Sequence, residues 1–189
     1  DLSKPEVRSM AAELGLRTAT KQESYEICFV PDDRYDRFLN EKVPDLQQRL
    51  SGGEILLDGN VVGHHQGYPF YTVGQRRGIG AYGKKMYVTG IDRESNTVTI
   101  GPDDALFRRS LIATQANWMG GDPSLGTLRV QAKVRYKDDA TPATAVIDTE
   151  GSFRLIFDKP KRAITPGQSV VMYDGEVVVG GGVIETVTD

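Results

Sequence analysis

The sequence predicts an α+β protein that is mainly β, and three observations lead to this prediction. Helical periodicity is confined to the first part of the chain. From Gly52 onward, short β-branched and aromatic runs alternate with Gly, Asp and Asn turns. Residues 128–137 alternate strictly between apolar and mostly cationic side chains, as in a half-buried strand. We therefore expect three parts, covering residues 1–48, 49–108 and 109–189.

The first part is expected to contain two helices and a short strand. Ser3 and Glu6 have capping-box spacing, and Gly15 would end a helix with this apolar face: Val7, Met10, Ala11 and Leu14. The run 27–30 resembles a buried strand. Asp32 or Asp33 could cap a second helix that ends before Pro44 and carries Tyr35, Phe38 and Leu39.

The second part is expected to be a small β domain. Asp58-Gly59 is a strong hairpin signal between the strands predicted at 54–57 and 60–62. A second pair is predicted at 86–91 and 98–100, and residues 101–104 close this domain.

The third part is expected to be a closed or nearly closed barrel. Its first clear strand is 128–137, which directs Leu128, Val130, Ala132, Val134 and Tyr136 to one side. Further strands are predicted at 143–147, 153–157, 169–173 and 176–179, with a hairpin at Asp174-Gly175.

Composition places the chain among ordinary globular proteins. Its 189 residues are 39% hydrophobic, with a net charge of -3 and one cysteine. A single cysteine excludes a disulfide scaffold, and there is no signal peptide and no apolar run of the roughly 18 residues that span a bilayer. We therefore expect a cytoplasmic protein with no membrane partner. Because a helix signal begins directly after Asp1, we also expect an N-terminal part to be missing.

Cys28 is the strongest nucleophile in the sequence. A thiol can attack, carry a sulfur atom or form a disulfide, and its reactivity requires deprotonation. Lys21 and Arg17 are candidate cations beside it, and His65 is a candidate base. The alternative is structural, because a cysteine between Ile27 and Phe29 resembles a small core residue.

Several other sites can be set aside on their context. Ser51-Gly52-Gly53 is followed by a hairpin and not by a helix, so it does not resemble a phosphate-binding loop. His64 and His65 are adjacent on a predicted strand and point to opposite faces, so we expect no metal site. No nucleophile-elbow motif supports a serine hydrolase.

Two basic stretches favour an RNA partner. Residues 68–88 contain Arg76, Arg77, Lys84 and Lys85 without any acid, and residues 129–137 contain four further cations. Arginine forks suit phosphate oxygens, and Gln75 could contact a base edge or a ribose hydroxyl. The alternative is a solvated turn with incidental charge.

Five motifs together resemble the tRNA-specific 2-thiouridylase family along essentially the whole chain. In order they are Lys4-Pro5-Glu6-Val7-Arg8, Ser24 with Ile27-Cys28-Phe29, Gly63-His64-His65-Gln66-Gly67, Thr72-Val73-Gly74-Gln75-Arg76-Arg77-Gly78, and Thr165-Pro166-Gly167-Gln168 with Gly180-Gly181-Gly182.

The resemblance implies a sulfurtransferase that replaces the 2-oxygen of the tRNA wobble uridine. Such enzymes adenylate the uridine with ATP, with Mg²⁺ expected, and deliver sulfur from a cysteine persulfide supplied by a sulfur-donor protein. The resemblance places the persulfide on Cys28. The partner cysteine and the ATP loop belong to an N-terminal ATP-pyrophosphatase domain, so we expect no cofactor in these residues and no activity from them alone.

The resemblance also assigns tRNA contacts. They fall on Arg135, Tyr136 and Gln168 in the barrel, and on Gln75, Arg76 and Arg77 in the central domain. Because strict alternation would turn Tyr136 inward, we expect the strand to end or bend there. Glu26 stands where the family commonly has glycine. The competing interpretation is a non-catalytic RNA-binding or protein-docking β module with a structural Cys28.

Overall fold

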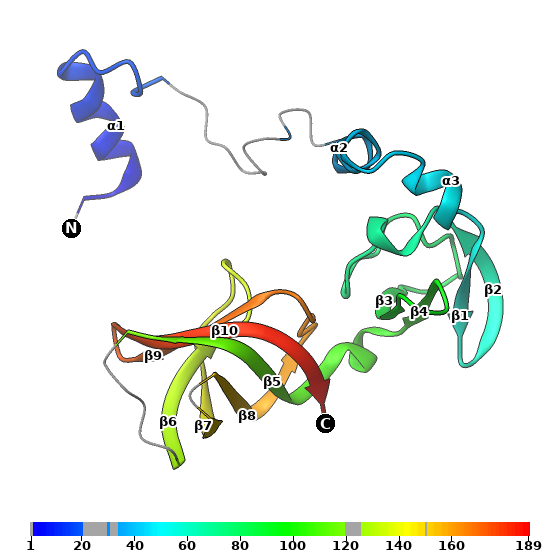
Figure 1. Cartoon of the computed structure of the whole chain (residues 1–189). Helices are drawn as coiled ribbons and strands as arrows, with labels where there is room; N and C mark the ends of the chain where they lie inside the picture. The colour runs from blue at the N-terminus through cyan, green and yellow to red at the C-terminus, as the bar shows by residue number, and fades with distance from the viewer. Residues whose placement is uncertain (1, 21–29, 31–33, 120–125, 150) are drawn as a thin grey trace. The chain divides into compact units, whose positions relative to one another are not determined.

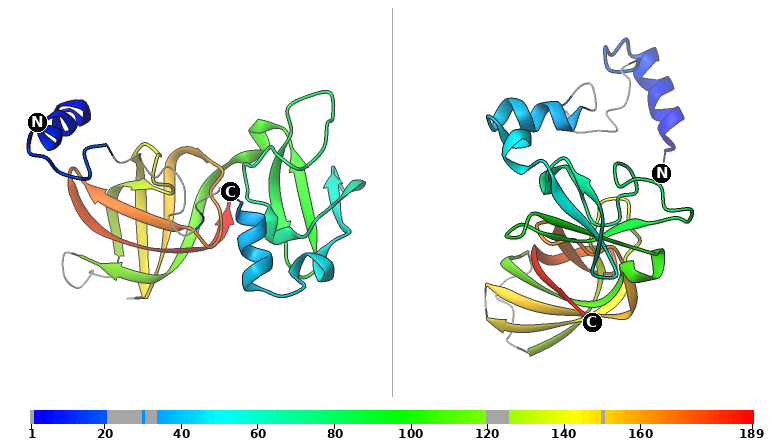
Figure 2. Two further views of the ribbon diagram at one scale, coloured as in Figure 1. Left: turned by 90° about the horizontal axis from the view of Figure 1, so that it is seen from above. Right: turned by 90° about the vertical axis from the view of Figure 1, so that its right-hand side faces the viewer.

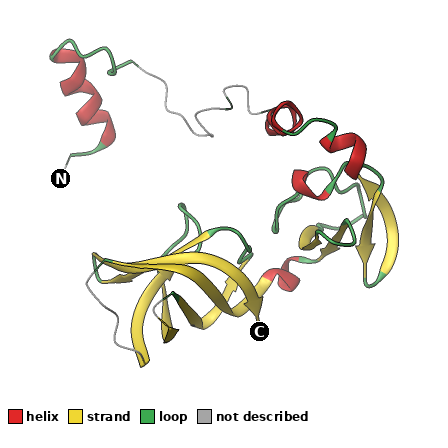
Figure 3. Ribbon diagram, viewed as in Figure 1, coloured by secondary structure: helices red, strands yellow, loops and turns green. Residues whose placement is uncertain are grey.

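The computed structural model describes residues 2–20, 30, 34–119, 126–149 and 151–189, which form two compact units, 1–44 and 45–189. The predicted class, α+β and mainly β, is confirmed: strands dominate and helices are few (Figure 3). None of the helices within the described ranges is long and apolar enough to cross a membrane.

The first unit contains helices α1 (Lys4–Glu13) and α2 (Tyr35–Lys42), near the predicted positions. The Ser3 backbone N–H donates to the Glu6 carboxylate over 2.7 Å, so the predicted capping interaction is present. The predicted apolar face of α1 is not a core, because this helix has no buried residue and Leu14 beyond it is 72% exposed. The N-cap of α2 is Arg34 and not a predicted aspartate. The predicted strand at 27–30 falls almost wholly outside the described residues.

The second unit begins with α3 (Leu46–Leu50), which the sequence did not predict, and a four-stranded sheet (Figure 1). Its strands are β1 (Gly53–Leu57), β2 (Asn60–His65), β3 (Tyr87–Asp92) and β4 (Thr97–Gly101). The order is β2-β1-β4-β3, in which both predicted hairpins are joined by a parallel β1–β4 pair. Ile55, Val88, Val98 and Ile100 form much of its core.

The rest of the second unit is a closed six-stranded barrel, as predicted, with strand order β10-β5-β8-β7-β6-β9 (Figure 2). Every neighbouring pair is antiparallel. The strands are β5 (Phe107–Trp118), β6 (Gly126–Lys133), β7 (Thr141–Thr149), β8 (Ser152–Arg162), β9 (Ser169–Asp174) and β10 (Val177–Thr188). Phe153, Leu155, Phe157, Val170 and Met172 fill the barrel interior.

The structure corrects the predicted barrel strands in number and in length. β5 was not predicted at all, and β8 and β10 extend well beyond the predicted spans. The predicted strand at 128–137 is too long, because β6 ends at Lys133. Val130, Ala132 and Val134 are buried as the alternation requires, but Tyr136 lies in the turn that follows. The expectation that the strand ends before Tyr136 is therefore confirmed.

Candidate nucleic-acid interface

A groove of about 940 Å³ brings together four of the side chains that the sequence assigned to tRNA: Gln75, Arg135, Tyr136 and Gln168. One wall is the loop 72–75 that precedes β3, and the other comes from the barrel. The remaining lining residues are Thr72, Val73, Gly74, Lys133, Val134, Gly167, Ser169, Val171 and Tyr173. Among the described residues, no acidic side chain lines this groove, so its charged side chains are cationic.

Arg135 joins the two walls. Its Nη2 nitrogen donates to the carbonyl oxygens of Val73 and Ala163, over 3.0 and 2.8 Å, and to Thr165 Oγ1 over 3.3 Å. Burial lowers the pKa of the guanidinium, nearby Arg162 lowers it further, and Asp138 opposes this change. The side chain is half-buried and lies just after the end of β6, whereas the sequence predicted it on the cationic face of that strand.

The loop 72–75 is held in place by a turn and by a close approach to the barrel. The Gln75 N–H donates to the Thr72 carbonyl, and the Gly74 N–H donates to the Val88 carbonyl over 2.8 Å. Gly74 has a φ of 89°, and a Cβ atom there would lie 3.1 Å from the Ala163 Cβ. Glycine is therefore needed for both the backbone conformation and the packing distance.

Gln168 enters the groove from a tight turn. Residues 165–168 have the features of a type II turn, with proline second, Gly167 third at a φ of 84°, and a Gln168 N–H to Thr165 carbonyl bond. Within the described structure, the Gln168 Oε1 atom is buried and has no hydrogen-bond partner. A buried acceptor without a donor is unfavourable, and a ligand N–H would satisfy it.

Tyr136 is the most exposed aromatic side chain at the groove, with 96% of its surface accessible. The turn that carries it is braced by Lys161, which is 9% exposed. Lys161 Nζ pairs with Asp138 over 3.0 Å and donates to the Asp139 carbonyl and to Thr141 Oγ1. A free tyrosine on a fixed turn can stack on an unpaired base.

Arg76 and Arg77 are not in the groove. Both are exposed in the loop that follows Gln75. Arg76 lines a separate depression of about 480 Å³ beside Lys84 and Lys85. The structure therefore divides the six predicted tRNA-binding residues between a groove and an adjacent cationic loop.

Sequence comparisons cover most of the chain with three domain families. Residues 1–32 match a tRNA methyl transferase HUP domain, residues 36–102 a tRNA methyl transferase PRC-barrel domain, and residues 108–184 an aminomethyltransferase beta-barrel domain. Curated relatives from Chlorobium luteolum, Salinibacter ruber and Halothermothrix orenii are each named tRNA-specific 2-thiouridylase MnmA. They are 51%, 49% and 46% identical over 97% of this chain.

The chain belongs to the tRNA-specific 2-thiouridylase family. It spans about half the length of these relatives, 52%, 49% and 51% respectively. The matched segments place a boundary between the central and barrel domains near residues 102–108, and the central segment begins at residue 36.

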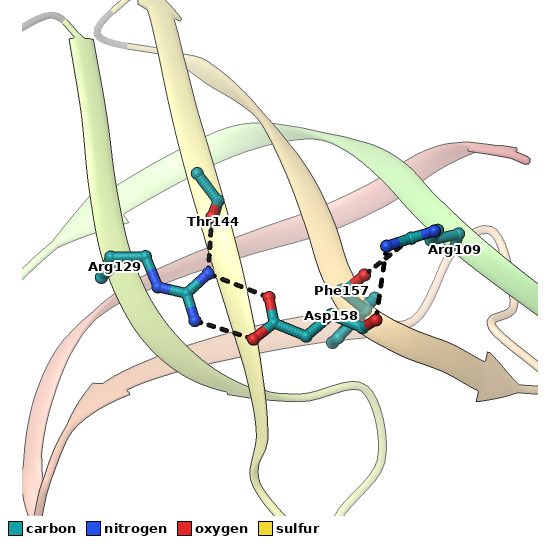
Figure 4. Close-up of polar contacts among 5 residues, drawn as sticks. All are labelled: Arg109, Arg129, Thr144, Phe157 and Asp158. Atoms are coloured by element: carbon teal, nitrogen blue, oxygen red, sulfur yellow. Dashed lines mark hydrogen bonds and ion pairs between the residues drawn. The ribbon is translucent and has the colours of Figure 1, made fainter.

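The predicted cationic face of β6 is partly neutralised. Arg129 forms a bidentate pair with Asp158 on β8, at 2.9 and 2.8 Å, and also donates to Thr144 Oγ1 on the intervening β7 (Figure 4). Arg109 donates to the carbonyl of Asp158 from the other side. The sequence did not reveal this because the partners are separated by 29 residues.

His65 has a structural role within the second unit. The Gly67 N–H donates to Nδ1 over 2.9 Å, so Nε2 carries the proton and donates to the Asn96 carbonyl over 3.1 Å. Burial lowers the pKa of the imidazole, and nearby His64 lowers it further. His65 is 4% exposed and His64 is exposed, so the predicted opposite orientation is confirmed.

Two further predictions concern sulfur and ATP. Cys28 and Lys21 lie outside the described residues, and Arg17 is exposed. Ser51 and Gly52 lie between α3 and β1, Gly53 is the first residue of β1, and a Cβ on Gly53 would clash with the His65 ring. These residues form the entry to a strand packed on a histidine, so they do not fit the triphosphate of ATP.

Proposed function

We propose that this chain supplies the tRNA-binding domains and the persulfide cysteine of a tRNA-uridine 2-sulfurtransferase. The observation that supports the proposal is the groove, which gathers Gln75, Arg135, Tyr136 and Gln168 from two β domains. The relatives' name supplies the reaction: thiolation of a tRNA uridine at position 2.

The groove has the chemistry to hold a single-stranded part of an RNA. Tyr136 offers an aromatic face, and the buried Gln168 Oε1 needs a donor such as a base N–H. Lys133 adds a cation, and its Nζ lies 5.9 Å from the Tyr173 ring centroid. These groups provide stacking, one directional hydrogen bond and attraction to phosphate, which together suit RNA better than an apolar ligand.

The proposed role of Cys28 is to carry sulfur to the uridine. In the full reaction ATP activates the 2-oxygen of uridine as a leaving group. The terminal sulfur of the Cys28 persulfide then attacks C2, and AMP departs. A second thiol breaks the remaining S–S bond and forms a disulfide with Cys28, so two thiols lose the two electrons that the transferred sulfur gains. The donor that reloads Cys28 would be a persulfide-carrying protein, and a cytoplasmic enzyme is consistent with this thiol chemistry.

A Cys28→Ser variant tests this assignment in a protein of the relatives' full length. We expect it to lose formation of 2-thiouridine while its dissociation constant for tRNA stays unchanged. Thiolation at the unaltered rate would instead favour the rival function, an RNA-binding or protein-docking module in which Cys28 is structural. Substrate tRNA and ATP must be saturating so that the rate reports the sulfur step.

A further inference from the structure

The loop 76–86 presents a second cationic surface beside the groove. Its four cationic side chains, Arg76, Arg77, Lys84 and Lys85, are all exposed. The depression of about 480 Å³ on this loop is lined by Arg76, Ile79, Gly80, Ala81, Tyr82, Gly83, Lys84, Lys85 and Met86. No acidic residue occurs between Asp58 and Asp92 in the sequence. The loop therefore contributes only positive charge.

The loop is anchored, although its cations are free to reach solvent. Ile79 and Met86 are each 2% exposed and pack in the core of the four-stranded sheet. The Tyr71 hydroxyl donates to the Gly78 carbonyl over 3.0 Å, and Gln75 Nε2 donates to the Arg77 carbonyl over 2.9 Å. A ligand that binds the cations thus meets a largely ordered backbone and a smaller entropic cost.

The cations of this loop also differ from those of the barrel. Among the residues described, none of the four pairs with a carboxylate within 4.0 Å, whereas Arg129 pairs with Asp158, Arg162 with Asp103 and Lys161 with Asp138. Four like charges on a short loop repel one another, and a bound anion relieves that repulsion. The charge of these three barrel cations is already partly balanced within the protein.

We propose that the loop 76–86 binds the phosphodiester backbone of an RNA whose neighbouring nucleotides occupy the groove. Gln75 lines the groove and the next residue, Arg76, lines the depression, so the backbone of a strand leaving the groove can be directed toward the loop. Arg76 can fork onto phosphate oxygens, and the two lysines act as point charges. This inference rests on the proposed function and adds Lys84 and Lys85 to its RNA-binding surface.

The dependence of tRNA binding on salt tests the proposal. The double variant Lys84→Ala/Lys85→Ala leaves every groove residue intact. With an unmodified tRNA transcript as probe, we expect the slope of log K against log [KCl] to become shallower by about 0.7 to 0.9 for each lost phosphate contact. Binding should weaken about tenfold at low salt and converge with the unaltered chain at high salt.

Two matched variants control for charge and position. Lys159→Ala removes an exposed lysine that belongs to β8 and not to the loop, and should leave the slope unchanged. Lys84→Arg/Lys85→Arg keeps the charge and should keep the slope. Circular dichroism of each variant verifies that the fold is retained.

The outcomes separate this inference from the function on which it rests. An unaltered chain that fails to bind tRNA overturns both. If the unaltered chain binds tRNA and the double alanine variant has the same slope of log K against log [KCl], only the loop proposal is overturned.

Discussion

The Arg135 Nη2 nitrogen lies 3.0 Å from the Val73 carbonyl oxygen, so one barrel side chain holds the loop that carries Gln75. The same nitrogen also bonds the Ala163 carbonyl and Thr165 Oγ1. Arg135→Ala should lower the free energy of unfolding by about 2 kcal/mol, because it leaves these acceptors without their charged donor. Urea unfolding measures this loss, and a variant as stable as the unaltered chain would show that the bonds contribute nothing.

Arg135 is also proposed to contact tRNA. Arg135→Ala should therefore weaken tRNA binding and make its salt dependence shallower by about 0.7 to 0.9 in slope, the value for one phosphate contact. Fluorescence anisotropy over a KCl series gives both quantities. Weaker binding with an unchanged slope would mean that Arg135 acts only by positioning the loop 72–75.

Gly74 permits the close approach of that loop to the barrel. Gly74→Ala should lower stability more than Gly175→Ala, although both glycines have positive φ angles, 89° and 58°. A Cβ at Gly175 has nothing within 4 Å, so that variant reports backbone strain alone, about 1 kcal/mol. A Cβ at Gly74 adds the 3.1 Å contact with the Ala163 Cβ. Equal losses of Tm in the two variants would contradict the packing argument.

His65 should make the fold sensitive to mild acid. Because its pKa is lowered in the folded state, the unfolded chain binds more protons, and stability falls as the pH drops below about 6.5. His65→Phe should flatten the stability profile between about pH 7 and pH 5, even if the variant is less stable throughout. His64→Gln removes the neighbour that adds to the lowered pKa of His65, so it should change the profile less than His65→Phe does. A His65→Phe profile as steep as that of the unaltered chain would contradict this origin.

Lys161 should support both the fold and the position of Tyr136. Lys161→Met leaves the partly buried Asp138 carboxylate without its partner, which should cost about 2 kcal/mol, less than a fully buried pair would. It should also weaken tRNA binding by releasing the turn. In a Tyr136→Ala background the same change should have no further effect on affinity, as a double-mutant cycle can measure. Additive losses would show that Lys161 acts on binding independently of Tyr136.

Local signals predicted much of the fold correctly. Asp58-Gly59 and Asp174-Gly175 identified hairpins because two-residue turns need backbone conformations that Asp-Gly readily adopts. The capping spacing of Ser3 and Glu6 identified α1. Alternation on β6 correctly predicted the burial of Val130.

Non-local relationships were not predictable in the same way. The parallel β1–β4 pair joins strands about 40 residues apart, and no local pattern specifies such a partner. β5 lacks a regular alternation, because Ser110 and Leu111 are both buried beside a register shift between Arg108 and Ser110. The candidate site was also only partly predictable. The motif resemblance pointed to Gln75 and Gln168, but only the structure shows that they line the same groove.

The groove is the centre of this account, and tRNA affinity tests it most directly. Tyr136→Ala/Gln168→Ala removes its free aromatic face and its unpartnered amide, while Val177→Ala, at a 69% exposed position on β10, serves as a surface control. We expect the groove variant to raise the dissociation constant for tRNA by at least tenfold, since stacking alone contributes about 1 to 3 kcal/mol. The control should bind as the unaltered chain does. Equal affinity of the groove variant and the unaltered chain would contradict the assignment of this groove to tRNA.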